Sequence, residues 1–208
     1  MRQPEVFSET RVDVMHAMMT EHPFAAVVSH ATGSLSADHV PLVVHSSVDP
    51  LGALHGYIAV SNPLFRETSG PIEVLCLFQG PQTYVTPAWY ASKKEHGKVV
   101  PTWNYVVVHA RGTLTFKRDP EWLMRHLHEL TDAHEQNRTQ PWAVTDAPDD
   151  YVARMLRGLV GFEIIINDLQ GTWKMSQNKG QADRSSVERG LAETGAADLA
   201  HLVQNRGA

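Results

Sequence analysis

The spacing of hydrophobic positions changes along the chain, and each change marks a new element. The first element is a helix that we expect to begin near Ser8. Val12, Met15 and Met19 recur at helical spacing, and Pro23 ends the pattern. One amphipathic helix is therefore expected before the first extended segment.

Strand signals follow this helix. Residues 72–78 are apolar at nearly every position, which predicts a central strand covered on both faces. Residues 105–116 alternate between an apolar and a polar side, and the polar side can meet solvent, a ligand or a partner subunit. Shorter apolar runs bounded by turn residues predict further strands over residues 24–29, 40–44, 51–60 and 161–169.

Two helices are expected between the last two strands. Asp119 followed by Pro120 is a strong start signal, because aspartate caps free backbone N–H groups and proline fits the first helical position. A shorter helix follows in residues 149–157, with Met155 directed inward. This part of the chain is therefore a helical segment between strands.

The order of elements favours an α+β fold, mainly β. Many strands with few helices between them suit a closed or partly open β-barrel with peripheral helices, since closure removes sheet edges. We expect one domain over residues 1–208, with a helical insertion at 119–157. Residues 180–208 form a helical C-terminal tail, with interruptions at Gly190 and Gly195.

Composition narrows the possible functions. The chain has 208 residues and a formal net charge of −5, with no basic arm, which argues against direct binding to DNA. Its single cysteine, Cys76, excludes an intrachain disulfide framework. No apolar run approaches the roughly 18 residues needed to cross a bilayer. We expect a soluble, cytoplasmic protein.

Twelve histidines raise the possibility of a metal site. His126, His128 and His134 share one predicted helix, but spacings of two and six residues do not bring their rings to one face. A solvated helix face explains them better, so no metal is expected. Cys76 lies in the most apolar run, where a thiol usually serves as inert packing.

Two segments carry more specific chemistry. Asn62 and Pro63 form a helix start, and a helix start beside Arg66 suits a phosphate, although such a start is more often only a cap. The aromatic and amide residues around Gln79, Trp103 and Asn104 suit a planar heteroaromatic ligand. A loop that plugs one end of the barrel explains the same residues equally well.

Several short motifs together resemble one family. They are Phe78-Gln79-Gly80-Pro81 with Tyr84, Val100-Pro101-Thr102-Trp103-Asn104-Tyr105, Gly158-Leu159-Val160-Gly161-Phe162, and Lys174-Met175-Ser176-Gln177-Asn178-Lys179. This combination resembles the PaiB-type family of FMN-binding negative transcriptional regulators. The resemblance implies an FMN-binding split barrel, related to pyridoxamine 5'-phosphate oxidase, in which two subunits pair and the flavin lies at their interface.

The resemblance also implies where FMN binds. The phosphate is expected near Asn62, with Arg66 as its charge partner. The isoalloxazine is expected to lie against Gln79, Trp103 and Asn104. The residues expected to contact the cofactor are His39, Pro41, Leu42, Tyr57, Asn62, Arg66, Gln79, Trp103, Asn104, Ser176, Gln177 and Asn178. Two positions depart from the family pattern. This chain has Tyr57 where the family has histidine, and Phe65 where the family has tryptophan.

The expected function is that of a homodimeric FMN-binding protein, either a negative transcriptional regulator or a flavin-dependent oxidoreductase. No residue is marked as a catalyst, because His39 and His109 suit hydrogen bonding better than proton transfer. The alternatives are a haem-binding protein on the same barrel and a repressor that contacts DNA.

Overall fold

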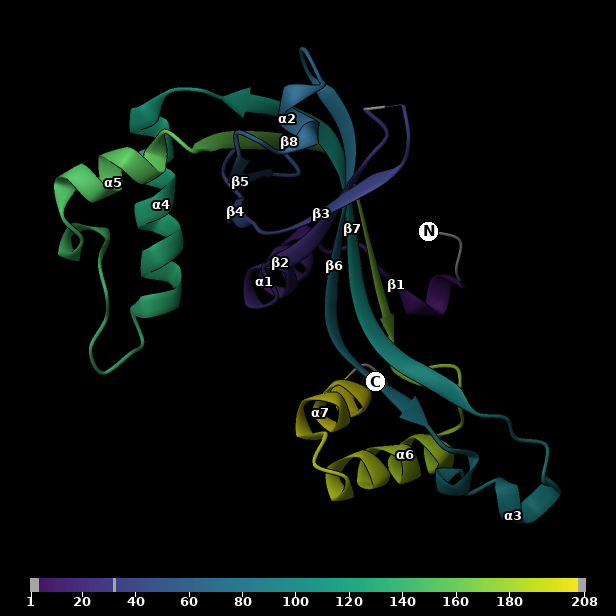
Figure 1. Cartoon of the computed structure of the whole chain (residues 1–208). Helices are drawn as coiled ribbons and strands as arrows, with labels where there is room; N and C mark the ends of the chain where they lie inside the picture. The colour runs from purple at the N-terminus through teal and green to yellow at the C-terminus, as the bar shows by residue number, and fades with distance from the viewer. Residues whose placement is uncertain (1–3, 32, 206–208) are drawn as a thin grey trace. The chain divides into compact units, whose positions relative to one another are not determined.

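The computed structural model describes residues 4–31 and 33–205 (Figure 1). The helices are α1 (Val12–Glu21), α2 (Pro63–Arg66), α3 (Lys93–His96), α4 (Pro120–Glu135), α5 (Asp149–Leu156), α6 (Gln181–Glu193) and α7 (Ala197–Asn205). The strands are β1 (Ser8–Glu9), β2 (Phe24–Ser29), β3 (Ser36–Pro41), β4 (Val43–His45), β5 (Ala53–Ala59), β6 (Ile72–Val85), β7 (Thr102–Lys117) and β8 (Leu159–Lys174). Short 3-10 turns occur at Glu5–Phe7, Pro87–Trp89 and Val144–Asp146.

The chain divides into two compact units. Unit 1 comprises Met1–Met18, Gln79–His109 and Gln170–Ala208, and unit 2 comprises Met19–Phe78 and Ala110–Leu169. The boundaries fall inside α1, β6, β7 and β8, so no linker separates the units. A single domain with an insertion at 119–157 stays a prediction.

Unit 2 contains most of the sheet. Its strands follow the order β3-β2-β6-β7-β8-β5-β4, and the β2–β3, β2–β6, β4–β5 and β5–β8 pairs are antiparallel. Leu42 and Phe162 occupy the space where a side chain on Gly56 would lie. The Trp122 ring of α4 fills the corresponding space at Gly161 of β8. The two glycines therefore permit close packing on β5 and β8.

Unit 1 combines strand ends with the two C-terminal helices. β1 pairs with β8 through Ser8 opposite Thr172. α6 and α7 pack against each other, and the Trp89 ring lies against Gly190 of α6. The backbone N–H and hydroxyl of Ser92 both donate to Asp183, at 2.9 and 2.8 Å. These contacts fix α6 against the segment between β6 and β7.

The helical tail and several capping signals are confirmed. Asp119 caps α4 by accepting a hydrogen bond from the backbone N–H of Glu121 at 3.0 Å. The tail forms α6 and α7, and Gly195 (φ 83°) lies between them. The interruption expected at Gly190 is wrong. This glycine lies within α6, where the Trp89 ring leaves no room for a side chain.

Four other local expectations are also wrong. The first helix begins at Val12, because Ser8 pairs with β8 instead. Residues 40–44 are divided between β3 and β4 at Leu42, whose N–H donates to the carbonyl of Pro23 at 2.9 Å. β6 is fully buried on one face only, since Glu73 on its other face is exposed. Met155, expected to be buried, is 49% exposed.

Candidate functional site

In unit 2, the predicted Asn62 cap is present. Its side-chain oxygen accepts from the N–H of Leu64 at 2.8 Å, and its Nδ2 donates to Asp38 of β3 at 2.6 Å. α2 is a single turn of four residues, so it contributes little dipole of its own. The Asp38 carboxylate adds negative charge beside the cap. An anion here therefore depends on nearby side-chain cations.

Two arginines supply positive charge near α2. Arg66 ends the helix and is exposed, and it forms no ion pair within the described part of the chain. The guanidinium of Arg118 lies 4.7 Å from the centre of the Phe65 ring. Phe65 also packs edge-on against Phe116, with ring centres 4.9 Å apart. The phenylalanine at this position therefore serves as a packing platform beside two cations.

The other expected cofactor contacts of unit 2 lie on β3, next to it and on β5. His39 is exposed on β3, with its ring 6.1 Å from that of Phe24. Pro41 ends β3 half-buried, and Leu42 is buried against Gly56. The Tyr57 ring lies edge-on to His126 of α4, with centres 6.1 Å apart. Tyr57 therefore faces α4.

In unit 1, Asn104 and Ser176 form a buried polar pair. The Ser176 hydroxyl donates to Oδ1 of Asn104 at 3.1 Å, and Asn104 is fully buried. Asn104 Nδ2 has no hydrogen-bond partner among the described residues. Ser176 has φ 62°, a left-handed conformation that costs a non-glycine residue free energy. A buried donor without an acceptor, beside a strained residue, is characteristic of a ligand site.

Loop 175–179 is stabilised mainly by contacts within unit 1. Gln177 Oε1 accepts from the N–H of Met175 at 2.6 Å, while its Nε2 donates to the carbonyl of Trp173. Its side chain therefore shapes the loop. Asn178 is exposed. Lys174 begins the last of the family motifs but is not among the expected cofactor contacts. It donates to the Thr102 hydroxyl, and burial together with the charge of Lys179 lowers its pKa.

An exposed aromatic pair lies in the same unit. The rings of Tyr84 and Trp103 are 6.2 Å apart at 72°, and the two residues are 47% and 51% exposed. Gln79 is also exposed, on β6. Unit 1 thus presents flat aromatic surface and amide groups, the chemistry expected for a planar ligand.

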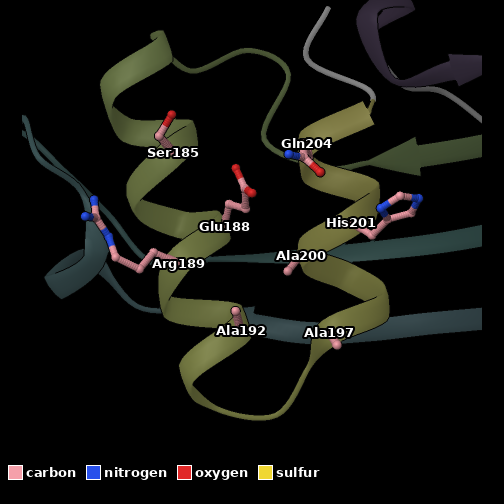
Figure 2. A pocket seen from close by; sticks show the side chains of 8 residues that line it. All are labelled: Ser185, Glu188, Arg189, Ala192, Ala197, Ala200, His201 and Gln204. Carbon is pink, nitrogen blue, oxygen red and sulfur yellow. The ribbon is translucent and has the colours of Figure 1, made fainter.

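A separate hollow lies between α6 and α7 (Figure 2). Glu188 and Arg189 give it a mixed polar character, and none of the predicted cofactor-contacting residues lines it. Its lining residues are Ser185, Glu188, Arg189, Ala192, Ala197, Ala200, His201 and Gln204. The hollow is therefore distinct from the predicted flavin contacts.

Comparison with known proteins defines the class. Residues 1–168 match a family described as "Putative FMN-binding domain", and the chain belongs to that family. Family membership confirms FMN as the predicted cofactor. Ser176, Gln177 and Asn178 lie beyond the matched residues.

Two relatives match almost end to end. Protease synthase and sporulation protein PAI 2 of Bacillus subtilis is 29% identical, over 98% of this chain and 96% of its own length. An uncharacterised protein of Emericella nidulans, AN0679, is 32% identical, over 97% of this chain and 96% of its own length. The resemblance to the PaiB type is confirmed.

Solved structures share the fold. An FAD and heme binding protein from Mycobacterium smegmatis has a TM-score of 0.58 at 14% identity, over 80% of this chain and 73% of its own. The flavocytochrome Anf3 from Azotobacter vinelandii has a TM-score of 0.56 at 11% identity, over 83% and 72% of the two chains. The expected split-barrel type of fold is confirmed. Within the described residues, no helix is both long and apolar enough to cross a membrane.

Proposed function

We propose that this chain binds FMN as a homodimer and acts as a flavin-dependent redox protein, either in turnover or in negative regulation of the PaiB type. The observation that carries the proposal is Asn104 Nδ2, a fully buried amide donor with no acceptor among the described residues. A buried donor left unpaired costs about 1–3 kcal/mol, which a ligand acceptor would recover.

Each unit, taken by itself, offers groups that suit one part of FMN. In unit 1, Asn104 offers an N–H donor, and Trp103 with Tyr84 offers aromatic surface for a flat ring system. In unit 2, Arg66 and Arg118 offer positive charge for a phosphate. When bound, FMN supplies the electron-transfer chemistry, while these side chains bind and orient it.

Regulation, in this proposal, does not require direct contact with DNA. The chain carries a net charge of −5, whereas non-specific DNA affinity depends on Lys and Arg that neutralise phosphates. A regulatory role would then act through a protein partner or through flavin-dependent metabolism. A gel shift at physiological salt tests this point.

The cofactor is tested on the purified protein and on one double variant. Wild-type protein should be yellow, with the two absorption bands of oxidised flavin and one FMN per chain. Asn104→Leu/Ser176→Ala replaces both members of the buried pair by apolar groups, which should leave the melting temperature nearly unchanged. FMN affinity should fall roughly 5- to 150-fold, the equivalent of about 1–3 kcal/mol.

Ser176→Ala alone is the matched control, since it keeps the Asn104 amide and should lose less affinity. Flavin fluorescence titration measures the FMN affinity of the wild type and of both variants. Equal FMN affinity in the wild type and the double variant would exclude Asn104 as a flavin contact. A Soret band in place of the flavin bands would favour the haem alternative instead.

A further inference from the structure

Three segments of unit 2 bring metal-binding side chains together. His45 ends β4, His55 lies in the adjacent strand β5, and Glu129 lies on α4. One ligand atom from each residue lies within 4.8 Å of the other two. The ring centres of the two histidines are only 3.7 Å apart. The fold thus gathers two imidazoles and one carboxylate that are far apart in the sequence.

The distance between His45 and Glu129 fits a shared ion. His45 Nε2 lies 3.3 Å from Glu129 Oε2, yet this buried nitrogen has no hydrogen bond among the described residues. Two ligand atoms, each about 2.0–2.2 Å from a tetrahedral Zn²⁺, lie roughly 3.3–3.5 Å apart. The observed 3.3 Å separation falls at the lower end of this range.

His55 has the support that a metal-bound histidine needs. Its Nε2 lies 3.1 Å from Oε2 of Glu163, which also pairs with Lys117 at 2.6 Å. A carboxylate that accepts the proton of one ring nitrogen fixes the tautomer and leaves the other nitrogen free to ligate. Glu163 therefore orients His55 and raises its basicity toward a metal.

A third histidine lies beside the cluster, because the ring centre of His126 is 6.3 Å from that of His55. His126 is buried on the same helix as Glu129, and both of its ring nitrogens lack partners among the described residues. It therefore packs beside the cluster without a hydrogen bond to it.

We infer that His45, His55 and Glu129 bind one divalent transition-metal ion, with Glu163 as the positioning residue of His55. Two imidazoles and a carboxylate form a ligand set typical of Zn²⁺ and other first-row divalent ions. The Glu129 side chain is 44% exposed, which gives an ion a path from solvent. All four residues lie in unit 2, and the inference does not depend on the flavin.

The test titrates Zn²⁺ into chelator-stripped, full-length protein in competition with a chromogenic chelator. Wild type should bind one Zn²⁺ per chain, and Co²⁺ in its place should give visible d–d absorption of low-symmetry coordination. Glu163→Gln should weaken binding roughly 10- to 100-fold. Glu129→Gln and His45→Ala each remove a ligand and should weaken it further.

His134→Ala is the matched control, because His134 is exposed on the same helix and outside the cluster. This variant should bind Zn²⁺ with the affinity of the wild type. Circular dichroism checks the fold of each variant, and the exposed Glu129→Gln decides the question if His45→Ala does not fold. Absence of stoichiometric Zn²⁺ binding by wild type, or equal affinity in Glu129→Gln and wild type, would overturn the inference.

Discussion

Arg66 provides a residue-scale test of where the FMN phosphate lies. If its exposed guanidinium pairs with the phosphate, Arg66→Ala removes a charge-assisted hydrogen bond of about 1.5–3 kcal/mol. FMN affinity should then fall roughly ten- to a hundredfold. Flavin fluorescence titration measures the change.

Riboflavin is the control ligand for Arg66, since it lacks the phosphate. It should bind wild type weakly and be almost insensitive to Arg66→Ala. Equal losses for the two ligands would mean that Arg66 supports the fold and that the phosphate lies elsewhere.

Cys76 allows a second residue-scale prediction. Its thiol is fully buried in β6, and desolvation raises its pKa to about 12. Because the thiolate is the reactive form, a thiol-specific chromogenic reagent should leave the native protein unmodified near pH 8. In denaturant the same reagent should titrate one thiol per chain. Rapid labelling of the native protein would contradict the burial of the Cys76 thiol.

Residue roles could be predicted from the sequence where they depend on neighbours in the chain. The caps formed by Asn62 and Asp119 are such cases, since a capping side chain accepts a hydrogen bond only two residues ahead. The link between Asn104 and Ser176 is not local. Both residues are among the expected cofactor contacts, but the unpaired amide of Asn104 depends on packing that no short pattern encodes.

At the scale of elements, α6 depends on a glycine in its interior. Alanine at Gly190 would place Cβ 2.5 Å from the Trp89 ring. Overpacking of this kind costs about 1–3 kcal/mol, more than the ~1 kcal/mol that alanine gains from helix propensity. Gly190→Ala should therefore lower the free energy of unfolding, measured by urea denaturation, by up to about 2 kcal/mol.

Gly180, the N-cap of the same helix, is the control for this substitution. A side chain there meets nothing within 4 Å, and serine is a preferred N-cap, so Gly180→Ser should be neutral or slightly stabilising. If Gly190→Ala stabilised the protein, Trp89 would have to move freely away from α6.

Element types could be predicted better than their limits. Alternation of polar and apolar residues located β7, and Asp119 located the start of α4. The lengths of β6 and β8 were underestimated, because both continue through polar segments that only pairing with other strands keeps extended. The proximity of His45, His55 and Glu129 could not be predicted for the same reason, since these residues meet only through β4–β5 pairing and α4 packing.

At the scale of the whole molecule, the homodimer stays a prediction with a direct test. Val100, in unit 1, is 67% exposed in a segment that leads into the exposed aromatic residue Trp103. A 23.1 kDa chain that pairs should sediment at about twice its mass. Val100→Asp should shift the protein toward monomer, since a buried unpaired charge is costly at an interface.

Leu35→Asp is the matched control for the dimer, because Leu35 is 76% exposed but lies in unit 2. It should leave sedimentation unchanged. Wild-type protein that sediments as a monomer with flavin bound would show that the site is complete in one chain.

Strands β6, β7 and β8 each begin in one compact unit and end in the other. A genetic exchange that replaced one unit alone would have to cut and rejoin three strands in register. Such an exchange has little chance of yielding a folded product. The two units are therefore expected to be inherited together. The Bacillus and Emericella relatives, which align over 96% of their own lengths, agree with such joint descent.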